Sequence, residues 1–407
     1  MEIDNSNQRM PTATPLNSPQ TRAGASALPV ALERIDRFVA RTQNWFYDHM
    51  RFVERHRPVV VCGSLENRDE FPDLEAVQID RERLDSRLWR KLGPARLYPP
   101  DARRLRRYRA VVFHSHLGYV AAGDLDFVDA LELPWVVSFY GADVYLLGRN
   151  PEWRERYAPL FARAGRILSL GPAMSAALER LGCPREKLVI HPLGVDAGGL
   201  PHRPRVLGPG EPLRILFSGT MREKKGGVYL IQALGQLFRK GVSFQLYLVG
   251  DALGRPGDAA TKAEIFHLIG ELGISDQVEH HSWLPFRDLV SLGLSCHVFV
   301  APSVTAADGD SEGTPAVMGQ MMATAMPTIA TRHSDIPYTF GPYADRLIPE
   351  RDAGAIADAL LKYAEEPERL TQDGLALRER ILTIFDVRVC APRLSGIYDG
   401  LGRGERA

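Results

Sequence analysis

The sequence predicts an α/β protein with two doubly wound domains, each built on a parallel sheet, that face one another across a cleft. Apolar runs of strand length alternate with longer segments of helical period, which implies parallel sheets covered on both faces. The alternation is interrupted once, at residues 197–212, where Gly and Pro are dense enough to indicate a linker. In this architecture ligands bind beyond the carboxyl ends of the strands, so we expect the functional site in the crevice.

The first domain is expected over residues 29–204. Its expected strands lie near 29–38 and at 58–62, 110–116, 134–140, 166–170 and 187–191. Helices are expected between them, at 152–164 and 172–182. The second of these helices opens with Gly171-Pro172, and proline suits the first turn of a helix.

The second domain is expected over residues 205–385, where the alternation of strands and helices restarts. Its expected strands lie at 213–218, 244–250, 278–283, 297–303 and 327–331. Residues 386–407 are expected to form a C-terminal helix that packs back on the first domain.

Composition narrows the class of protein. Of the 407 residues, 45% are hydrophobic and 25% charged, as in a globular protein, and the formal net charge of zero gives no electrostatic case for nucleic acid. No apolar run approaches the roughly 20 residues that span a bilayer, and no signal sequence is evident, so we expect a cytoplasmic protein. Residues 1–28 are rich in Ser, Thr, Pro, Ala and Asn and are expected to be disordered. The widely spaced cysteines indicate reduced thiols: Cys62, Cys183, Cys296 and Cys390.

The segment 301–331 is the most informative part of the chain. A short apolar strand leads into a polar loop with Asp308, Asp310 and Glu312, and a Glu-Gly-Thr-Pro turn then starts a helix. Acidic side chains beside a helix N-terminus suit a ligand that carries both hydroxyls and phosphate. The alternative is an ordinary β–loop–α unit with a solvated acidic loop.

Two further strand ends of the second domain carry candidate ligand contacts. After the strand at 213–218 come Gly219, Arg222, Lys224, Lys225 and Gly226. A glycine turn followed by lysine at a helix start can hold an anion, although a solvated turn has the same composition and the spacing is not that of a P-loop. Gly250 and Asp251 follow the next strand, where a base or ribose could pack.

No metal site is expected. His114 and His116 point the same way from one strand, but no third ligand of suitable type lies at a fixed spacing. Asp308 and Asp310 lie in an Asp/Gly-rich loop, where such residues are common, and are expected at the rim of the site.

Taken together, these motifs resemble the retaining glycosyltransferases of the GT-B fold, family four. The resemblance covers residues 110–385 and is strong over 213–335. The matching elements are Gly219 to Gly226; Glu312 with its turn and Gln320; His191 to Asp196; and His114 to Gly118.

The resemblance implies a role for each matching residue. Lys225 would hold the donor diphosphate and stabilise the charge that develops on the departing nucleotide. Glu312 would bind the donor sugar's hydroxyls, with the Gly313 and Thr314 amides nearby, and Gln320 would face the ribose. His116 or His114 would line the transfer side of the cleft. The resemblance further implies a nucleotide-diphosphate sugar as co-substrate, a saccharide or lipid-linked hydroxyl acceptor that attacks from the face of the leaving group, and no metal or cofactor.

Three positions depart from the family's pattern. Gln320 stands where relatives have a glutamate, and its neutral hydrogen bond to ribose would be weaker by about 1 kcal/mol. Thr220 stands where relatives have a diphosphate-binding arginine, and Arg222 could take the role of that arginine. Tyr140 precedes Gly141 where many relatives have His-Gly, and residues 41–52 stand where a Gly-rich loop is usual. A degenerate relative that binds sugar nucleotides or serves as a partner subunit, without efficient transfer, is therefore the alternative.

Residues 81–109 hold eleven Arg or Lys against three Asp or Glu, interleaved with apolar residues. Such a basic amphipathic stretch could rest on anionic lipid at the inner face of the membrane, or hold a lipid-diphosphate acceptor. A solvated helical face is the alternative. An NAD-dependent oxidoreductase would fit the alternation of elements, but no Gly-x-Gly-x-x-Gly follows a strand.

Overall fold

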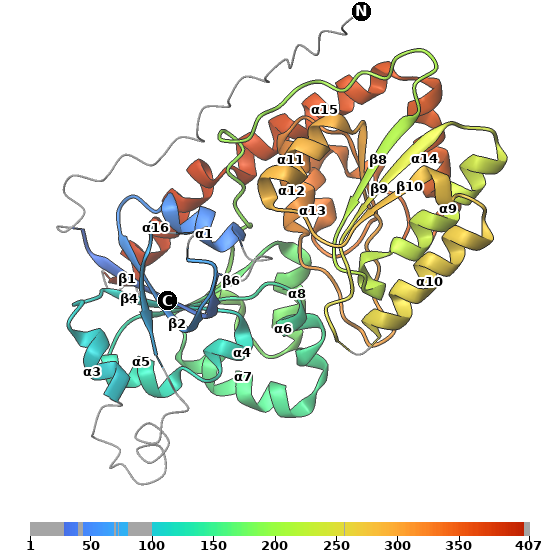
Figure 1. Cartoon of the computed structure of the whole chain (residues 1–407). Coiled ribbons are helices and arrows are strands. Elements are labelled where there is room, and N and C mark those ends of the chain that lie inside the picture. The colour runs from blue at the N-terminus through green and yellow to red at the C-terminus, as the bar shows by residue number, and fades with distance from the viewer. Residues whose placement is uncertain are drawn as a thin grey trace, which may run out of the picture.

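The computed structural model describes residues 28–39, 44–68, 71, 73–79, 100–255 and 257–402 (Figure 1). Within these ranges the chain forms two α/β domains, each with a parallel sheet between helices. The expected fold class, two doubly wound parallel-sheet domains that face a cleft, is confirmed. The tail expected at 1–28, apart from its last residue, and residues 81–99 of the basic stretch lie outside the described part of the chain.

The described part of the first domain contains a seven-stranded sheet in the order β3-β2-β1-β4-β5-β6-β7. The strands are β1 (Val30–Phe38), β2 (Arg57–Leu65), β3 (Glu75–Gln78), β4 (Val112–His116), β5 (Trp135–Ser138), β6 (Arg166–Ser169) and β7 (Leu188–Ile190). The helices are α1 (Asn44–Arg51), α3 (Pro100–Arg106), α4 (Gly118–Ala121), α5 (Leu125–Leu131), α6 (Ala142–Tyr145), α7 (Pro151–Arg163) and α8 (Pro172–Arg180), with short 3₁₀ turns at Leu147–Arg149 and Arg185–Lys187. Strand β3 has no apolar run because only Val77 of its four residues is buried.

The second domain contains a five-stranded sheet in the order β10-β9-β8-β11-β12. Its strands are β8 (Leu213–Ser218), β9 (Phe244–Val249), β10 (Val278–His281), β11 (Val298–Ala301) and β12 (Thr328–Ala330). The helices that follow the linker are α9 (Gly227–Arg239), α10 (Asp258–Glu271), α11 (Phe286–Ser295), α12 (Ala316–Ala323), α13 (Ile336–Phe340), α14 (Ala353–Glu365), α15 (Glu368–Arg380) and α16 (Val387–Gly402). Shorter turns lie at Glu223–Lys225, Ser275–Gln277, Gly341–Arg346 and, as a π-helical turn, Ile381–Phe385.

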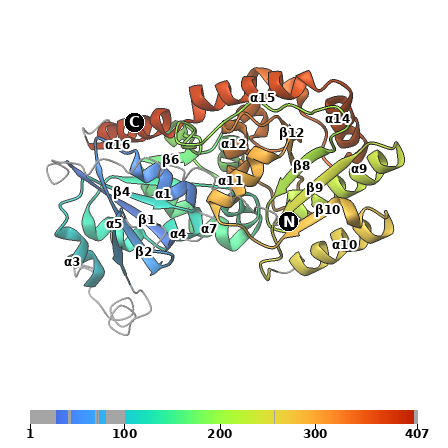
Figure 2. The ribbon, with the colours of Figure 1, turned by 45° about the horizontal axis from the view of Figure 1, so that its top comes forward.

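The first sheet is buried on both faces, which explains why its central strands are apolar without alternation. One face, with Phe113 and Val137, packs against α5, α7 and α8. The other face, with Val112 and Val136, packs against α1 and against the C-terminal helix α16. Figures 1 and 2 show α16 lying along the first domain although it follows the whole second domain in sequence.

The chain crosses between the domains at two places that touch each other. Val195 precedes the linker at 197–212, and its amide donates to the carbonyl of Phe385 at 2.7 Å, while the amide of Val387 donates to the carbonyl of Val195 at 3.0 Å. The linker itself is fastened to the second domain by Arg205, which is 2% exposed and donates to backbone carbonyls of α11 and α12 and to that of Cys296. These bonds satisfy a guanidinium that would otherwise be costly to bury.

The remaining features concern the surface and the thiols. All four cysteines are free and buried, as expected. Helix α3 exposes Arg103, Arg104 and Arg106 while burying Leu105. No helix in the described ranges has the length and apolar content needed to cross a bilayer.

Candidate active site

A cleft of about 1240 Å³ lies between the two domains at the carboxyl ends of the strands of the second sheet. Gly219 follows β8, Gly250 follows β9, and Glu312 lies in the loop after β11, so three neighbouring strands of one sheet deliver them to the same edge. Gly250 packs so closely on this edge that a Cβ there would lie 1.9 Å from the carbonyl oxygen of Gly219. The crossing of strands and loops therefore needs glycine at this position.

The structure brings most of the expected site residues to this cleft. Those that line it are Gly219, Thr220, Arg222, Lys225, Gly250, Asp251, Glu312, Thr314 and Gln320. Gly313 lies just behind the wall, where a Cβ would meet the carbonyl oxygen of Tyr140 at 2.4 Å. His116 lines a small pocket that shares Trp45 and Tyr140 with this cleft.

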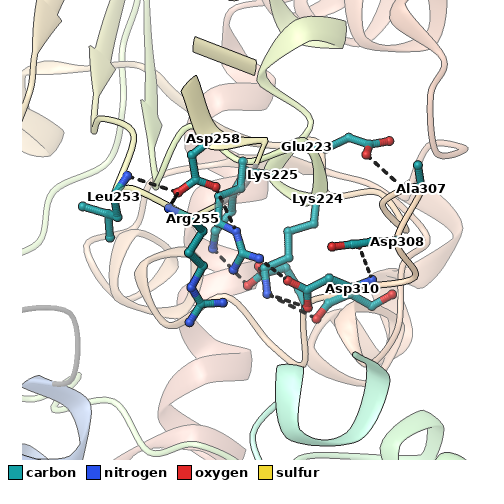
Figure 3. Close-up of polar contacts among 12 residues, drawn as sticks. Glu223, Lys224, Lys225, Leu253, Arg255, Asp258, Ala307, Asp308 and Asp310 are labelled. Atoms are coloured by element: carbon teal, nitrogen blue, oxygen red, sulfur yellow. Dashed lines mark hydrogen bonds and ion pairs between the residues drawn. The ribbon is translucent and has the colours of Figure 1, made fainter. Parts of the chain in front are cut away.

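Glu312 is held by two lysines (Figure 3 shows the surrounding contacts). Lys225 Nζ lies 2.9 Å from Oε2 of Glu312, and Lys224 Nζ lies 3.1 Å from Oε1. Burial alone would raise the pKa of Glu312, but the ammonium groups of Lys225 and Lys224 lower it to about 2. The carboxylate is therefore ionised at neutral pH and can only accept hydrogen bonds.

The sequence indicated that Asp310 lies at the rim of the site. In the structure Asp310 instead anchors the loop that carries Arg222 and Lys224. It is 1% exposed, and its carboxylate contacts Arg222 at 2.6 Å and Lys224 at 3.2 Å. Arg222 also pairs with Asp258 at 3.4 Å, and it lines the cleft. Asp308 accepts the amide of Asp310 at 2.9 Å and serves the turn of the loop.

Gln320 presents an unpaired amide to the cleft. It lies on α12, is 6% exposed, and has no hydrogen-bond partner among the residues that the structure describes. The amide therefore has a donor and an acceptor available for a ligand in the cleft.

His116 lies behind Tyr140, next to the cleft, and the expectation that a histidine lines the transfer side stays a prediction. Its Nε2 lies 3.0 Å from Glu33 and its Nδ1 2.5 Å from the hydroxyl of Tyr140, which does line the cleft. Burial lowers the pKa of His116 to about 3. The neutral ring therefore donates from Nε2 to the carboxylate and accepts at Nδ1 from Tyr140.

Glu33 completes a group that could hold a metal ion. Its carboxylate and one nitrogen each of His114 and His116 lie within 4.8 Å of one another. The third ligand comes from β1, far upstream, so sequence spacing could not reveal it. The same atoms also form a closed hydrogen-bond network, in which Tyr398 donates to Glu33 at 2.8 Å and the second nitrogen of His114 meets Ser138 at 2.8 Å.

The wall contributed by the first domain was not expected from sequence. Helix α1 contributes Trp45, Tyr47, Asp48 and Arg51, and Tyr140 lies outside this helix. The helical spacing of residues 44, 45, 48, 51 and 52 places them on one face of a helix. These residues are aromatic and polar and form no apolar stripe, so the spacing was not recognised as a helix face that lines the cleft. On the opposite wall, Trp283 also lines the cleft and is 46% exposed.

Two parallel-sheet domains around such a cleft, with a Lys–Glu pair at the strand ends of the second, define a glycosyltransferase of the GT-B fold. Residues 202–376 match the family model "Glycosyl transferases group 1", and residues 50–198 match "Glycosyltransferase Family 4". The chain belongs to this glycosyltransferase family. It is an enzyme that takes its sugar from a nucleotide-sugar donor.

Two relatives and two solved structures illustrate the match. The chain is 31% identical over 300 residues, 72% of this chain and 71% of the other, to the putative colanic acid biosynthesis glycosyltransferase WcaL of Escherichia coli (strain K12). It is 29% identical over 297 residues, 72% and 71% of the two chains, to the amylovoran biosynthesis glycosyltransferase AmsK of Erwinia amylovora.

The solved structures share the fold at low sequence identity. Sucrose-phosphate synthase from Thermosynechococcus elongatus superimposes with a TM-score of 0.72 at 18% identity, over 93% of this chain and 100% of that one. Anabaena Alr3699/HepE in complex with UDP gives 0.72 at 14% identity, over 92% and 100%.

Proposed function

We propose that this enzyme transfers a sugar, with retention of configuration and without a metal ion, from a nucleoside-diphosphate sugar to a hydroxyl of a saccharide or lipid-linked acceptor. The observation that supports this most directly is the pair formed by Lys225 and Glu312 on the cleft wall. A cation that can bind the diphosphate and an ionised carboxylate that can accept from sugar hydroxyls lie side by side, so we assign the anomeric carbon of a bound donor to the space beside this pair.

In this proposal Lys225 binds the donor diphosphate and stabilises the charge that grows on the leaving nucleotide. Glu312, released from Lys225 by the incoming phosphate, accepts hydrogen bonds from the donor sugar. The acceptor hydroxyl attacks the anomeric carbon on the face that the diphosphate leaves. The bond from that carbon to the diphosphate oxygen breaks, and a leaving phosphate oxygen takes the proton of the hydroxyl.

The nucleotide is assigned to the strand ends beyond Lys225. Gln320 would bind the ribose with its unpaired amide, while Gly219, Thr220, Gly250 and Asp251 would line the nucleotide's path. HepE is described in complex with UDP and with UDP-glucose, which makes UDP-sugars the first donors to test. A binder without transfer is not favoured, because the relatives are named as glycosyltransferases.

The proposal is tested with UDP-, GDP- and ADP-sugars, by measuring donor binding and nucleotide release for the wild type, Lys225→Ala and Glu312→Ala. Lys240→Ala is the matched control, because Lys240 is an exposed surface lysine. We expect loss of Lys225 to reduce nucleotide release at least a hundredfold, by analogy with other single charge-stabilising groups. A wild type that binds none of these donors would refute the assignment.

A further inference from the structure

Helix α1 turns one face to the cleft and the other into the core. Phe46, His49 and Met50 are at most 5% exposed and pack inside the first domain. Asn44, Trp45, Asp48, Arg51 and Phe52 line the cleft. The inner face fixes the helix, so the outer face is a rigid wall opposite the donor residues.

Trp45 and Tyr140 form an aromatic platform at the end of this wall that is nearest the loop carrying Glu312. The ring centroids of Trp45 and Tyr140 lie 4.5 Å apart, and both side chains line the cleft. Tyr140 is held through its hydroxyl by His116, and its carbonyl packs against Gly313, the residue after Glu312. The platform therefore lies directly beside the position assigned to the donor sugar.

Asp48 lies one turn of α1 beyond Trp45 and offers a carboxylate without a partner. It is partly buried and lines the cleft, and no described residue makes a hydrogen bond or ion pair with it. Asp196, on the same wall, is instead paired with Arg388 at 2.8 Å. Burial, followed by the nearby charge of Asp196, raises the pKa of Asp48 to about 7, and the charge of Arg51 on the same helix opposes this rise in part.

We propose that Trp45, Tyr140 and Asp48 form the acceptor subsite, and that its ligand is an uncharged saccharide unit packed on the aromatic pair with hydroxyls donated to Asp48. A sugar ring offers an apolar face to aromatic side chains and hydroxyl donors at its edge. A hydroxyl can donate to the carboxylate of Asp48, whereas a uronate oxygen cannot, so a neutral sugar ring fits this carboxylate better than an anion does. This inference rests on the proposed function, because the subsite is defined by its position beside the donor sugar.

The test separates acceptor binding from donor binding. With the donor found above, nucleotide release is measured against the methyl glycosides of glucose, galactose and mannose, cellobiose, and the methyl glycoside of glucuronic acid. Donor affinity and the slow release of nucleotide to water are measured without acceptor. The variants are Asp48→Asn, Trp45→Ala and Trp45→Phe, and Glu155→Gln is the control, since Glu155 is exposed on α7, on the surface of the same domain.

We expect Asp48→Asn and Trp45→Ala each to raise the acceptor KM about tenfold, as for the loss of one buried hydrogen bond or contact. Donor affinity and release to water should stay as in the wild type, and Trp45→Phe should restore part of the loss. An unchanged acceptor KM in Asp48→Asn, preference for the glucuronide, or no response to any neutral saccharide by an enzyme that binds its donor would overturn the inference. Failure to bind any donor would instead count against the proposed function.

Discussion

Replacing Gly313 with alanine would place a methyl group in the contact between the two domains. Its Cβ would lie 2.4 Å from the carbonyl oxygen of Tyr140 and 2.9 Å from terminal atoms of Leu170 and Met174. The two side-chain ends can move, but the carbonyl belongs to a backbone segment held by Asp143, which accepts the amides of Tyr140 and Gly141. Relief to an ordinary contact therefore requires the loop at Gly313 to withdraw by about 1 Å.

The expected cost has two parts. Overpacking of this kind destabilises a protein by about 1–3 kcal/mol. Displacement of the loop also moves Glu312 from its partner Lys225, and a 1 Å error in a positioned group can reduce turnover about a hundredfold. We therefore expect Gly313→Ala to lower kcat by one to two orders of magnitude, with a smaller loss of thermal stability.

The assay is nucleotide release at saturating donor, together with thermal unfolding. Gly270→Ala is the matched control, because a Cβ on Gly270 of α10 meets nothing within 4 Å. Alanine in a helix should leave activity unchanged and add up to about 1 kcal/mol of stability. Wild-type kcat in Gly313→Ala would refute the argument that this close approach positions Glu312.

Four further outcomes are expected. Gln320→Glu should tighten nucleotide binding roughly fivefold to tenfold, since a charge-assisted bond to ribose is stronger; unchanged or weaker affinity would mean that the side chain does not reach the ribose. Asp48→Asn should stabilise the fold by on the order of 2 kcal/mol at pH 8 and not at pH 4. The reason is that an acid whose pKa is raised from 3.8 to about 7 in the folded protein costs stability as pH rises through that interval. Equal changes in the free energy of unfolding at both pH values would contradict this. Dialysis against a chelator should leave the melting temperature unchanged. Glu33→Gln should lower the free energy of unfolding by about 3 kcal/mol, because it leaves the partners of Glu33 unpaired. Stoichiometric zinc in the purified protein would contradict the closed hydrogen-bond network. Residues 81–109 should carry the protein to anionic liposomes in a flotation assay, and recovery with the unbound fraction would favour a solvated surface.

The parts of the structure that sequence predicted well are those fixed by local pattern. Continuous apolar runs predicted the central strands, since burial on both faces leaves little choice of residue. The edge strand β3 was not predicted, because a single buried residue makes no recognisable pattern. Lys225 and Glu312 follow strand ends of a parallel sheet, and that topology alone brings them to one edge.

The parts that sequence missed depend on contacts between distant segments. His116 is turned inward by Glu33, a residue of β1, and by the tyrosine that covers it. Asp310 is buried because two cations reach it from the β8–α9 loop. Helix α1 lines the cleft with polar and aromatic residues, so its hydropathy did not distinguish the cleft face from a solvated one.

The position of α16 has a consequence for synthesis of the chain. One face of the first sheet is covered by Leu394 and Tyr398, and Tyr398 also bonds the buried Glu33. A ribosome delivers these residues after the whole second domain, so this face of the first sheet stays incompletely covered until α16 has emerged. The second domain can assemble earlier, because its two core clusters contain no residue beyond Phe385. A premature stop just before α16 would therefore harm the first domain, although the second domain is the one that lies next to the stop in sequence.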